Sequence, residues 1–154
     1  MNLILEKSID VFGLSETKLK TRTAKLLYRN DLSYTSWWGC DNDHLDATGV
    51  GLIIYNNISK YVQKVKHYKG RVIHAKLFLK GKIKLYIMQV YIQAHDLAKK
   101  DKLASYKYII DIINQCRKEK TEIIIMGDFN VDPDILVDLE CSNTRSIHWK
   151  YKLV

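Results

Sequence analysis

Two acidic residues stand directly after apolar segments that are typical of strands. Glu16 follows the run at residues 11–14, and Asp128 follows the run at residues 123–126. Strand ends in layered α/β sheets open onto a common edge where ligands collect, so we expect both carboxylates at that edge. Oxygen ligands of this kind suit Mg²⁺, which takes few protein carboxylates and keeps waters and substrate phosphates. The cation can polarise a phosphoryl oxygen, and a second carboxylate can align or deprotonate an attacking water.

Each of these segments also has a structural interpretation. Glu16-Thr17 is the kind of pair that caps a helix or forms a turn, and Gly127-Asp128 is a common turn sequence. The spacing alone therefore leaves metal binding and turn formation both open.

The strands that would position these residues follow from apolar patterning. Alternating apolar residues predict two strands joined by Lys80-Gly81-Lys82, a three-residue hairpin loop with glycine available for the left-handed position. Residues 18–48 show little periodicity and are interpreted as a loop. The predicted strands are residues 10–14, 49–55, 72–79, 83–91 and 122–126, and the last, rich in isoleucine, is expected to be buried on both sides.

One helix is predicted at residues 97–118. Leu103, Tyr106, Ile110 and Ile113 fall at helical spacing, and further isoleucines widen this apolar face. A helix that leads into a buried strand, after several strands, predicts a layered α/β or α+β domain.

Composition bounds the class of protein. The chain has 154 residues, of which 47% are apolar and 27% charged, an ordinary globular composition for one domain. No apolar run approaches the roughly 18 residues of a membrane span, so we expect no membrane partner. The three cysteines are widely spaced and lack a metal or disulfide pattern. We therefore expect an intracellular protein with reduced thiols, the nucleus being one option.

The net charge of +8 is concentrated in the middle of the chain. Residues 60–107 hold thirteen basic residues and two acidic ones, a balance of +11, whereas the flanking segments are slightly acidic. Such a bias is typical of proteins with an anionic partner, most commonly nucleic acid. A solvated lysine surface that keeps the protein soluble is the alternative, and charge alone does not separate the two.

Five segments, in this order, resemble motifs of the endonuclease/exonuclease/phosphatase superfamily. They are the segment ending in Glu16-Thr17, a glycine-led strand from Gly49, a strand opening at Gly70-Arg71, the strand end Val90-Tyr91, and Gly127-Asp128-Phe129-Asn130. The resemblance runs from about residue 9 to residue 134. Within the superfamily it is closest to apurinic-type endonucleases and to endonuclease domains of non-LTR retrotransposons.

The resemblance implies a four-layered α/β sandwich and phosphodiester cleavage with Mg²⁺ or Mn²⁺. It assigns Glu16 as metal ligand, Tyr91 as the residue facing the scissile phosphate, and Asp128 as the residue that orients or activates water. Asn130 would hydrogen-bond the phosphate or hold the surroundings of Asp128 in place. Arg71 would bind the nucleic-acid backbone or form a structural salt bridge. DNA is the expected partner.

The sequence departs from the superfamily pattern at both ends. The opening strand would precede residue 1, and the C-terminal half, which supplies a closing Asp-His pair, is absent. Ser146-Ile147-His148 resembles that pair only faintly, because it lacks the Asp and lies too close to Asn130. Residues 1–154 are therefore interpreted as a single, truncated domain of this superfamily.

Truncation leaves three functional hypotheses. The first is a Mg²⁺-dependent, DNA-cleaving endonuclease with impaired or absent activity. The second is a non-catalytic nucleic-acid-binding remnant of a mobile-element protein, and the third is a phosphatase acting on a phosphorylated lipid or sugar. Half a sandwich would also expose an apolar sheet face, so self-association through that face is expected.

Overall fold

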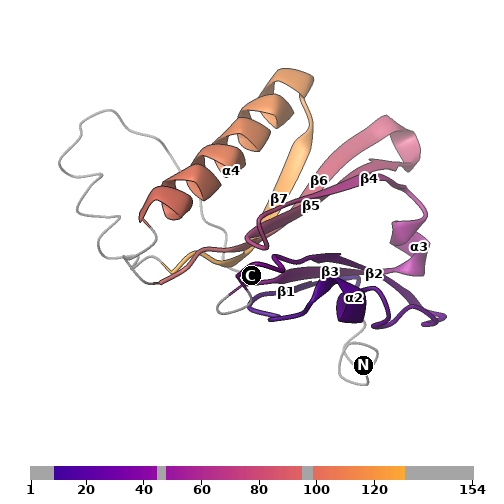
Figure 1. The fold of residues 1–154 in the computed structure, drawn as a ribbon. Coiled ribbons are helices and arrows are strands. Elements are labelled where there is room, and N and C mark those ends of the chain that lie inside the picture. Colours follow the sequence, from indigo (N-terminus) through magenta and orange to yellow (C-terminus); the bar gives the residue numbers. More distant parts are fainter. Residues whose placement is uncertain (1–8, 45–47, 95–98, 131–154) are drawn as a thin grey trace.

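The structure of the chain is a computed structural model, which describes residues 9–44, 48–94 and 99–130 (Figure 1). Its elements, in chain order, are β1 (Val11–Leu14), α2 (Thr21–Ala24), β2 (Tyr34–Gly39), β3 (Val50–Tyr55), α3 (Asn56–Ser59), β4 (Val62–Tyr68), β5 (Val72–Leu79), the 3-10 turn η1 (Lys80–Lys82), β6 (Ile83–Tyr91), α4 (Lys99–Glu119) and β7 (Glu122–Asp128). In this part of the chain, no helix is long and apolar enough to cross a membrane.

The strands form two sheets that lie one above the other (Figure 1). The first has the order β1-β3-β2 with antiparallel pairing, and the second has the order β4-β5-β6-β7. Within the second sheet β4, β5 and β6 pair antiparallel, whereas β6 and β7 pair parallel. A parallel pair needs a crossover, and α4 supplies it.

Three apolar clusters hold the layers together. Between the sheets, Leu52 and Ile54 of β3 pack with Ile73 and Leu77 of β5. On the other side of the four-stranded sheet, residues of β5 and β6 pack with Ile109, Ile112 and Cys116 of α4. A third cluster lies on the outer face of the three-stranded sheet, where Figure 1 also shows the short helix α2. The arrangement is an α/β sandwich, as predicted.

Several predicted elements are confirmed. The strands at residues 72–79 and 83–91 match β5 and β6, and Gly81 between them has a φ of 77°. The predicted helix matches α4 within two residues at each end. Its buried side is rotated from the prediction, however, since Leu103 and Ile110 are exposed and Ile109, Ile112 and Cys116 face the sheet.

Two parts of the sequence-based prediction are wrong. Residues 18–48 are not one loop, because Tyr34–Gly39 forms β2. This strand lacks the alternation of apolar and polar residues, because the adjacent Trp37 and Trp38 pack on opposite faces of a sheet that is covered on both sides. β7 is not buried on both sides: among the described residues it is an edge strand of its sheet, and Ile124 is 51% exposed.

The predicted uncovered sheet face is also not found among the described residues. The two sheets cover each other, so the exposed apolar side chains of the described residues lie elsewhere, among them Ile124 on the edge strand and Leu103 and Ile110 on α4. Self-association remains a prediction, but the edge of β7 replaces an open sheet face as its expected contact.

Candidate active site

The candidate site lies where the ends of β1, β6 and β7 meet. Because β6 and β7 run parallel and in register, Tyr91 and Asp128 stand side by side at their C-terminal ends. The amide of Ile92 donates to the carbonyl oxygen of Asp128 at 2.8 Å, which fixes the two strand ends to each other. Gly127 has a φ of 134° and touches the backbone of Val90, so only glycine fits this approach.

The end of β1 reaches this place from the other sheet. The side-chain amide of Gln89 donates to Ser15 Oγ at 2.8 Å, and Ser15 Oγ donates to the carbonyl oxygen of Val90 at 3.4 Å. Gly13 makes room for Gln89, since a Cβ there would collide with the Gln89 side chain. These contacts carry Glu16, the next residue, to the end of β6.

Glu16 lies on a short, unusual backbone segment. Glu16 and Lys18 have φ values of 53° and 52°, a left-handed conformation that is costly for residues other than glycine. Backbone hydrogen bonds from Thr17 to Gly49 at 3.0 Å and from Lys18 to Thr48 at 2.9 Å hold the segment in place. The Glu16 side chain is 44% exposed, and its Oε1 lies 3.1 Å from Lys18 Nζ.

Tyr91 is the group on which the charges of the site converge. Its side chain is 5% exposed, and burial raises the pKa of the phenol; the charges of Glu16 and Asp128 raise this pKa further, while Arg71 and Lys18 lower it. Both carboxylates therefore act on the same hydroxyl although their residues come from different sheets. The hydroxyl stays protonated at neutral pH and can donate a hydrogen bond.

Asn130 orders the carboxylate of Asp128. The Asn130 amide donates to Asp128 Oδ1 at 2.9 Å, and Asn130 Nδ2 donates to the carbonyl oxygen of Ile92 at 2.6 Å. Asn130 has a φ of 45°, a left-handed conformation that Asn tolerates better than most residues. The contacts leave Asp128 Oδ2 and Asn130 Oδ1 as acceptors for a ligand.

Arg71 links the site to a neighbouring cavity. Its guanidinium lies 5.6 Å from the centre of the Tyr91 ring, and its carbonyl oxygen accepts a 2.7 Å hydrogen bond from the Tyr91 amide. Burial lowers the pKa of Arg71, although Tyr91, Asp41 and Asp101 oppose this change. The adjoining cavity has a volume of about 830 Å³ and is lined by Arg71, Lys69, Gln93 and acidic residues that include Asp41 and Asp101.

The donor set fits a hard divalent cation with few protein ligands. Glu16 and Asp128 offer carboxylate oxygens, and Thr17 Oγ1, which is buried without a hydrogen-bond partner, is directed towards Gly49. Among the residues that the structure describes, no cluster of three His, Cys, Asp or Glu side chains is present. Mg²⁺ does not require one, because it binds through one or two carboxylates and otherwise through water and phosphate.

The structure thus brings Glu16, Tyr91, Asp128, Asn130 and Arg71 to one end of the molecule. Lys18 and Thr17 also belong to this place, and the sequence carries no signal for them beyond their position next to Glu16. Ser146-Ile147-His148 lies outside the described residues.

Solved structures with this fold were found at low sequence identity. TDP2 from Caenorhabditis elegans is 10% identical, with a TM-score of 0.62 over 86% of this chain and 41% of that one. A humanized D. rerio TDP2 is 17% identical, with a TM-score of 0.57 over 90% of this chain and 59% of that one. The human Nocturnin catalytic domain with bound sulfate is 18% identical, with a TM-score of 0.61 over 93% of this chain and 59% of that one.

These neighbours are members of the endonuclease/exonuclease/phosphatase superfamily, and the chain has the fold of that superfamily. It spans 41% to 59% of the length of the structures named above. No model of a protein family and no curated protein matched the sequence. The fold is therefore established by structure, and activity has to be argued from the site.

Proposed function

We propose that this chain carries a Mg²⁺-dependent phosphodiesterase site that cleaves DNA. The observation that supports it most is that Glu16 and Asp128, 112 positions apart in sequence, both lie at the end of β6. Asp128 pairs with Tyr91, and Ser15, which precedes Glu16, hydrogen-bonds to Val90. A structural turn explains either carboxylate alone. It does not explain why segments from two different sheets bring both carboxylates to the strand end that carries Tyr91.

Glu16 is the proposed metal ligand. Its carboxylate is accessible and lies 3.1 Å from Lys18 Nζ, and this contact with a cation supports the assignment. A bound Mg²⁺ would polarise a phosphoryl oxygen and neutralise charge that builds up in the transition state.

Asp128, Tyr91 and Asn130 supply the remaining functions. With Oδ1 held by the Asn130 amide, Asp128 Oδ2 is free to accept a hydrogen bond from the attacking water and to orient it. The Tyr91 hydroxyl donates a hydrogen bond to a non-bridging phosphoryl oxygen, and Arg71 beside it attracts the backbone phosphates. Because each group is fixed by the strand ends, its position does not depend on substrate.

A cleavage assay on abasic-site and plain duplex DNA with Mg²⁺ tests the proposal. We expect Glu16→Gln to reduce cleavage by about a hundredfold or more, since the site loses its metal ligand. Glu122→Gln is the matched control, because Glu122 is exposed at the other end of β7 from Asp128. It should cleave like the wild type.

Two results would count against the proposal. Wild-type activity no greater than that of Glu16→Gln would support a non-catalytic nucleic-acid-binding chain instead. Release of phosphate from an inositol phosphate, without cleavage of DNA, would favour a phosphatase of the same fold.

A further inference from the structure

One corner of the four-stranded sheet, on the side where α4 packs, is basic. Cross-strand pairing places the residues of this side in rows, of which one joins Lys66 to His74 and the next joins Lys64 to Lys76. The last row joins Phe78 of β5 to Lys84 of β6. The helix covers His74 through Tyr108, whose hydroxyl lies 3.1 Å from His74 Nε2. It leaves Lys64, Lys66, Lys84 and Phe78 exposed, and these four residues are called the basic face.

The charge of the basic face is balanced only in part, because Glu119 of α4, which pairs with Lys76, also interacts with Lys84. Residues 62–91 contain no Asp or Glu at all. Lys76 forms an ion pair of 2.8 Å with Glu119 of α4, but in the described part of the chain Lys64, Lys66 and Lys84 form no ion pair. Lys80 and Lys82 lie in the adjoining turn and add to the positive potential.

Protection of a sheet edge explains only part of this pattern. Lysines on an edge strand discourage unwanted strand pairing, which accounts for Lys64 and Lys66 on β4. Lys84 pairs with Phe78 of β5, and the ladder between β6 and β7 begins at the next residue, Leu85. Lys84 therefore borders a covered edge, and edge protection accounts for it less well than for Lys64 and Lys66. Phe78 is 45% exposed among these lysines, so an aromatic ring is open to solvent within a basic surface.

We propose that the basic face binds single-stranded nucleic acid. The lysines neutralise successive phosphates, and Phe78 offers a flat ring on which an unpaired base stacks, the combination typical of single-strand binding. Lys64 and Lys66 are two residues apart on one strand, a separation of about 6.7 Å. A duplex would leave Phe78 without a partner, since its bases are already stacked.

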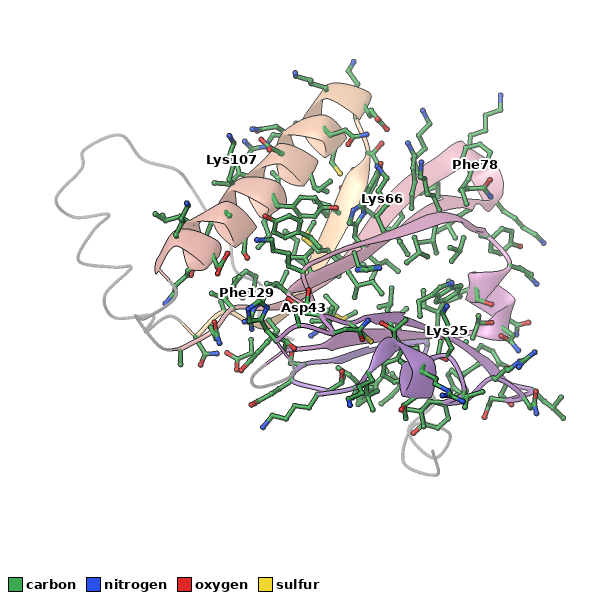
Figure 2. All side chains as sticks on the ribbon, viewed as in Figure 1. Lys25, Asp43, Lys66, Phe78, Lys107 and Phe129 are labelled. Atoms are coloured by element: carbon green, nitrogen blue, oxygen red, sulfur yellow. The ribbon has the colours of Figure 1, made fainter. Side chains whose placement is uncertain are left out.

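This surface is separate from the candidate active site. Tyr91 packs between the sheets, whereas Lys84 and Phe78 lie on the opposite face. Along β6, Lys84 and Tyr91 are seven residues apart, about 23 Å at 3.3 Å per residue. Figure 2 shows Phe78 at one end of the molecule and Phe129, which follows Asp128, at the other. Binding here thus goes beyond the proposed cleavage.

Fluorescence anisotropy with a labelled 20-nucleotide single strand, in EDTA, tests the proposal on the full chain. We expect the triple variant Lys64→Gln, Lys66→Gln, Lys84→Gln to bind about tenfold more weakly or worse. Its plot of log affinity against log salt concentration should be less steep by about two, for three lost phosphate contacts. Phe78→Ala should weaken binding of the single strand about fivefold or more while leaving duplex binding unchanged.

The matched control removes the same charge elsewhere. Lys25→Gln, Lys100→Gln, Lys107→Gln changes three exposed lysines outside the basic face, and Figure 2 shows Lys25 and Lys107 away from Phe78. This control should bind like the wild type, and because EDTA removes divalent metal from the assay, the result is independent of whether the chain cleaves DNA. Circular dichroism confirms that all variants are folded.

Three outcomes would overturn the proposal. Equal loss in the two triple variants would show a general charge effect. Polyglutamate that competes as well as the oligonucleotide would identify an acidic peptide surface, and duplex binding lost to the same extent in Phe78→Ala would remove the stacking role.

Discussion

Tyr91 shows how single residues acquire a chemical role from their surroundings. Burial and two neighbouring carboxylates raise the pKa of its phenol, so the group is a proton donor across the neutral range. Tyr91→Phe keeps the ring in the core and removes the donor alone. We expect cleavage to fall about tenfold to a hundredfold, with the melting temperature nearly unchanged.

The pH dependence of Tyr91→Phe follows from the same direction of shift. Because the pKa of the phenol is raised from an ordinary value that is already alkaline, the hydroxyl does not titrate between pH 6 and 9. The pH–rate profiles of variant and wild type should therefore have the same shape there. An alkaline decline near pH 8 that vanishes in Tyr91→Phe would contradict this role.

His74 is a second residue whose surroundings set its ionisation. It is 5% exposed, and burial together with the charge of Lys66 lowers its pKa to about 4. Since the unfolded chain binds the proton more readily, the stability that neutral His74 contributes is present above pH 6.5 and lost as the pH falls towards 4. The loss amounts to about 3 kcal/mol.

Urea denaturation at several pH values checks this prediction. The free energy of unfolding of the wild type should fall between pH 6.5 and 4.5 by more than that of His74→Gln. Identical slopes in the two proteins would show that His74 is freely protonated in the folded state.

At the scale of elements, the sequence was sufficient where one face of an element differs from the other. β5, β6 and α4 were predicted close to their observed bounds for this reason. β2 was not predicted because Trp37 and Trp38 pack on opposite faces of the sheet, so apolar and polar residues do not alternate along this strand. The burial of β7 was wrong because apolar composition does not reveal whether a neighbouring strand is present.

The candidate site was likewise predictable from the sequence only in part. Its residues could be chosen from motifs that the superfamily shares, since those motifs follow the strand ends. The left-handed turn at Glu16 and Lys18 is held by backbone bonds to Thr48 and Gly49, and the bond from Gln89 to Ser15 joins residues 74 positions apart. No local sequence pattern predicts such contacts.

A substitution at Gly127 tests how closely the ends of β6 and β7 approach each other. In Gly127→Ala the new methyl would collide with the carbonyl of Val90 at a positive φ, and we expect a loss of about 3 kcal/mol or more. Gly81→Ala is the control, because Gly81 has a positive φ but open space around it; it should cost about 1 kcal/mol. Equal losses in chemical denaturation would mean that no close contact exists at Gly127.

For the whole molecule, the exposed edge of β7 dominates the expected behaviour in solution. An unpaired strand edge with exposed apolar side chains favours association with another chain. We expect the protein to self-associate, and Ile124→Lys to raise the dissociation constant at least about tenfold by placing charge at that edge. Sedimentation velocity measures this. Leu103→Lys, a change at an exposed residue of α4, should have little effect, and if it disperses the protein instead, the helix surface is the contact.

The convergence of Glu16 and Asp128 on one cation site is the central claim, and paramagnetic broadening by Mn²⁺ tests it without requiring turnover. In amide NMR spectra, we expect substoichiometric Mn²⁺ to broaden Thr17, Ile92 and Asn130 first, and this broadening to disappear in Glu16→Gln. Broadening centred instead on the acidic loop at residues 41–44, or unchanged in Glu16→Gln, would contradict the account.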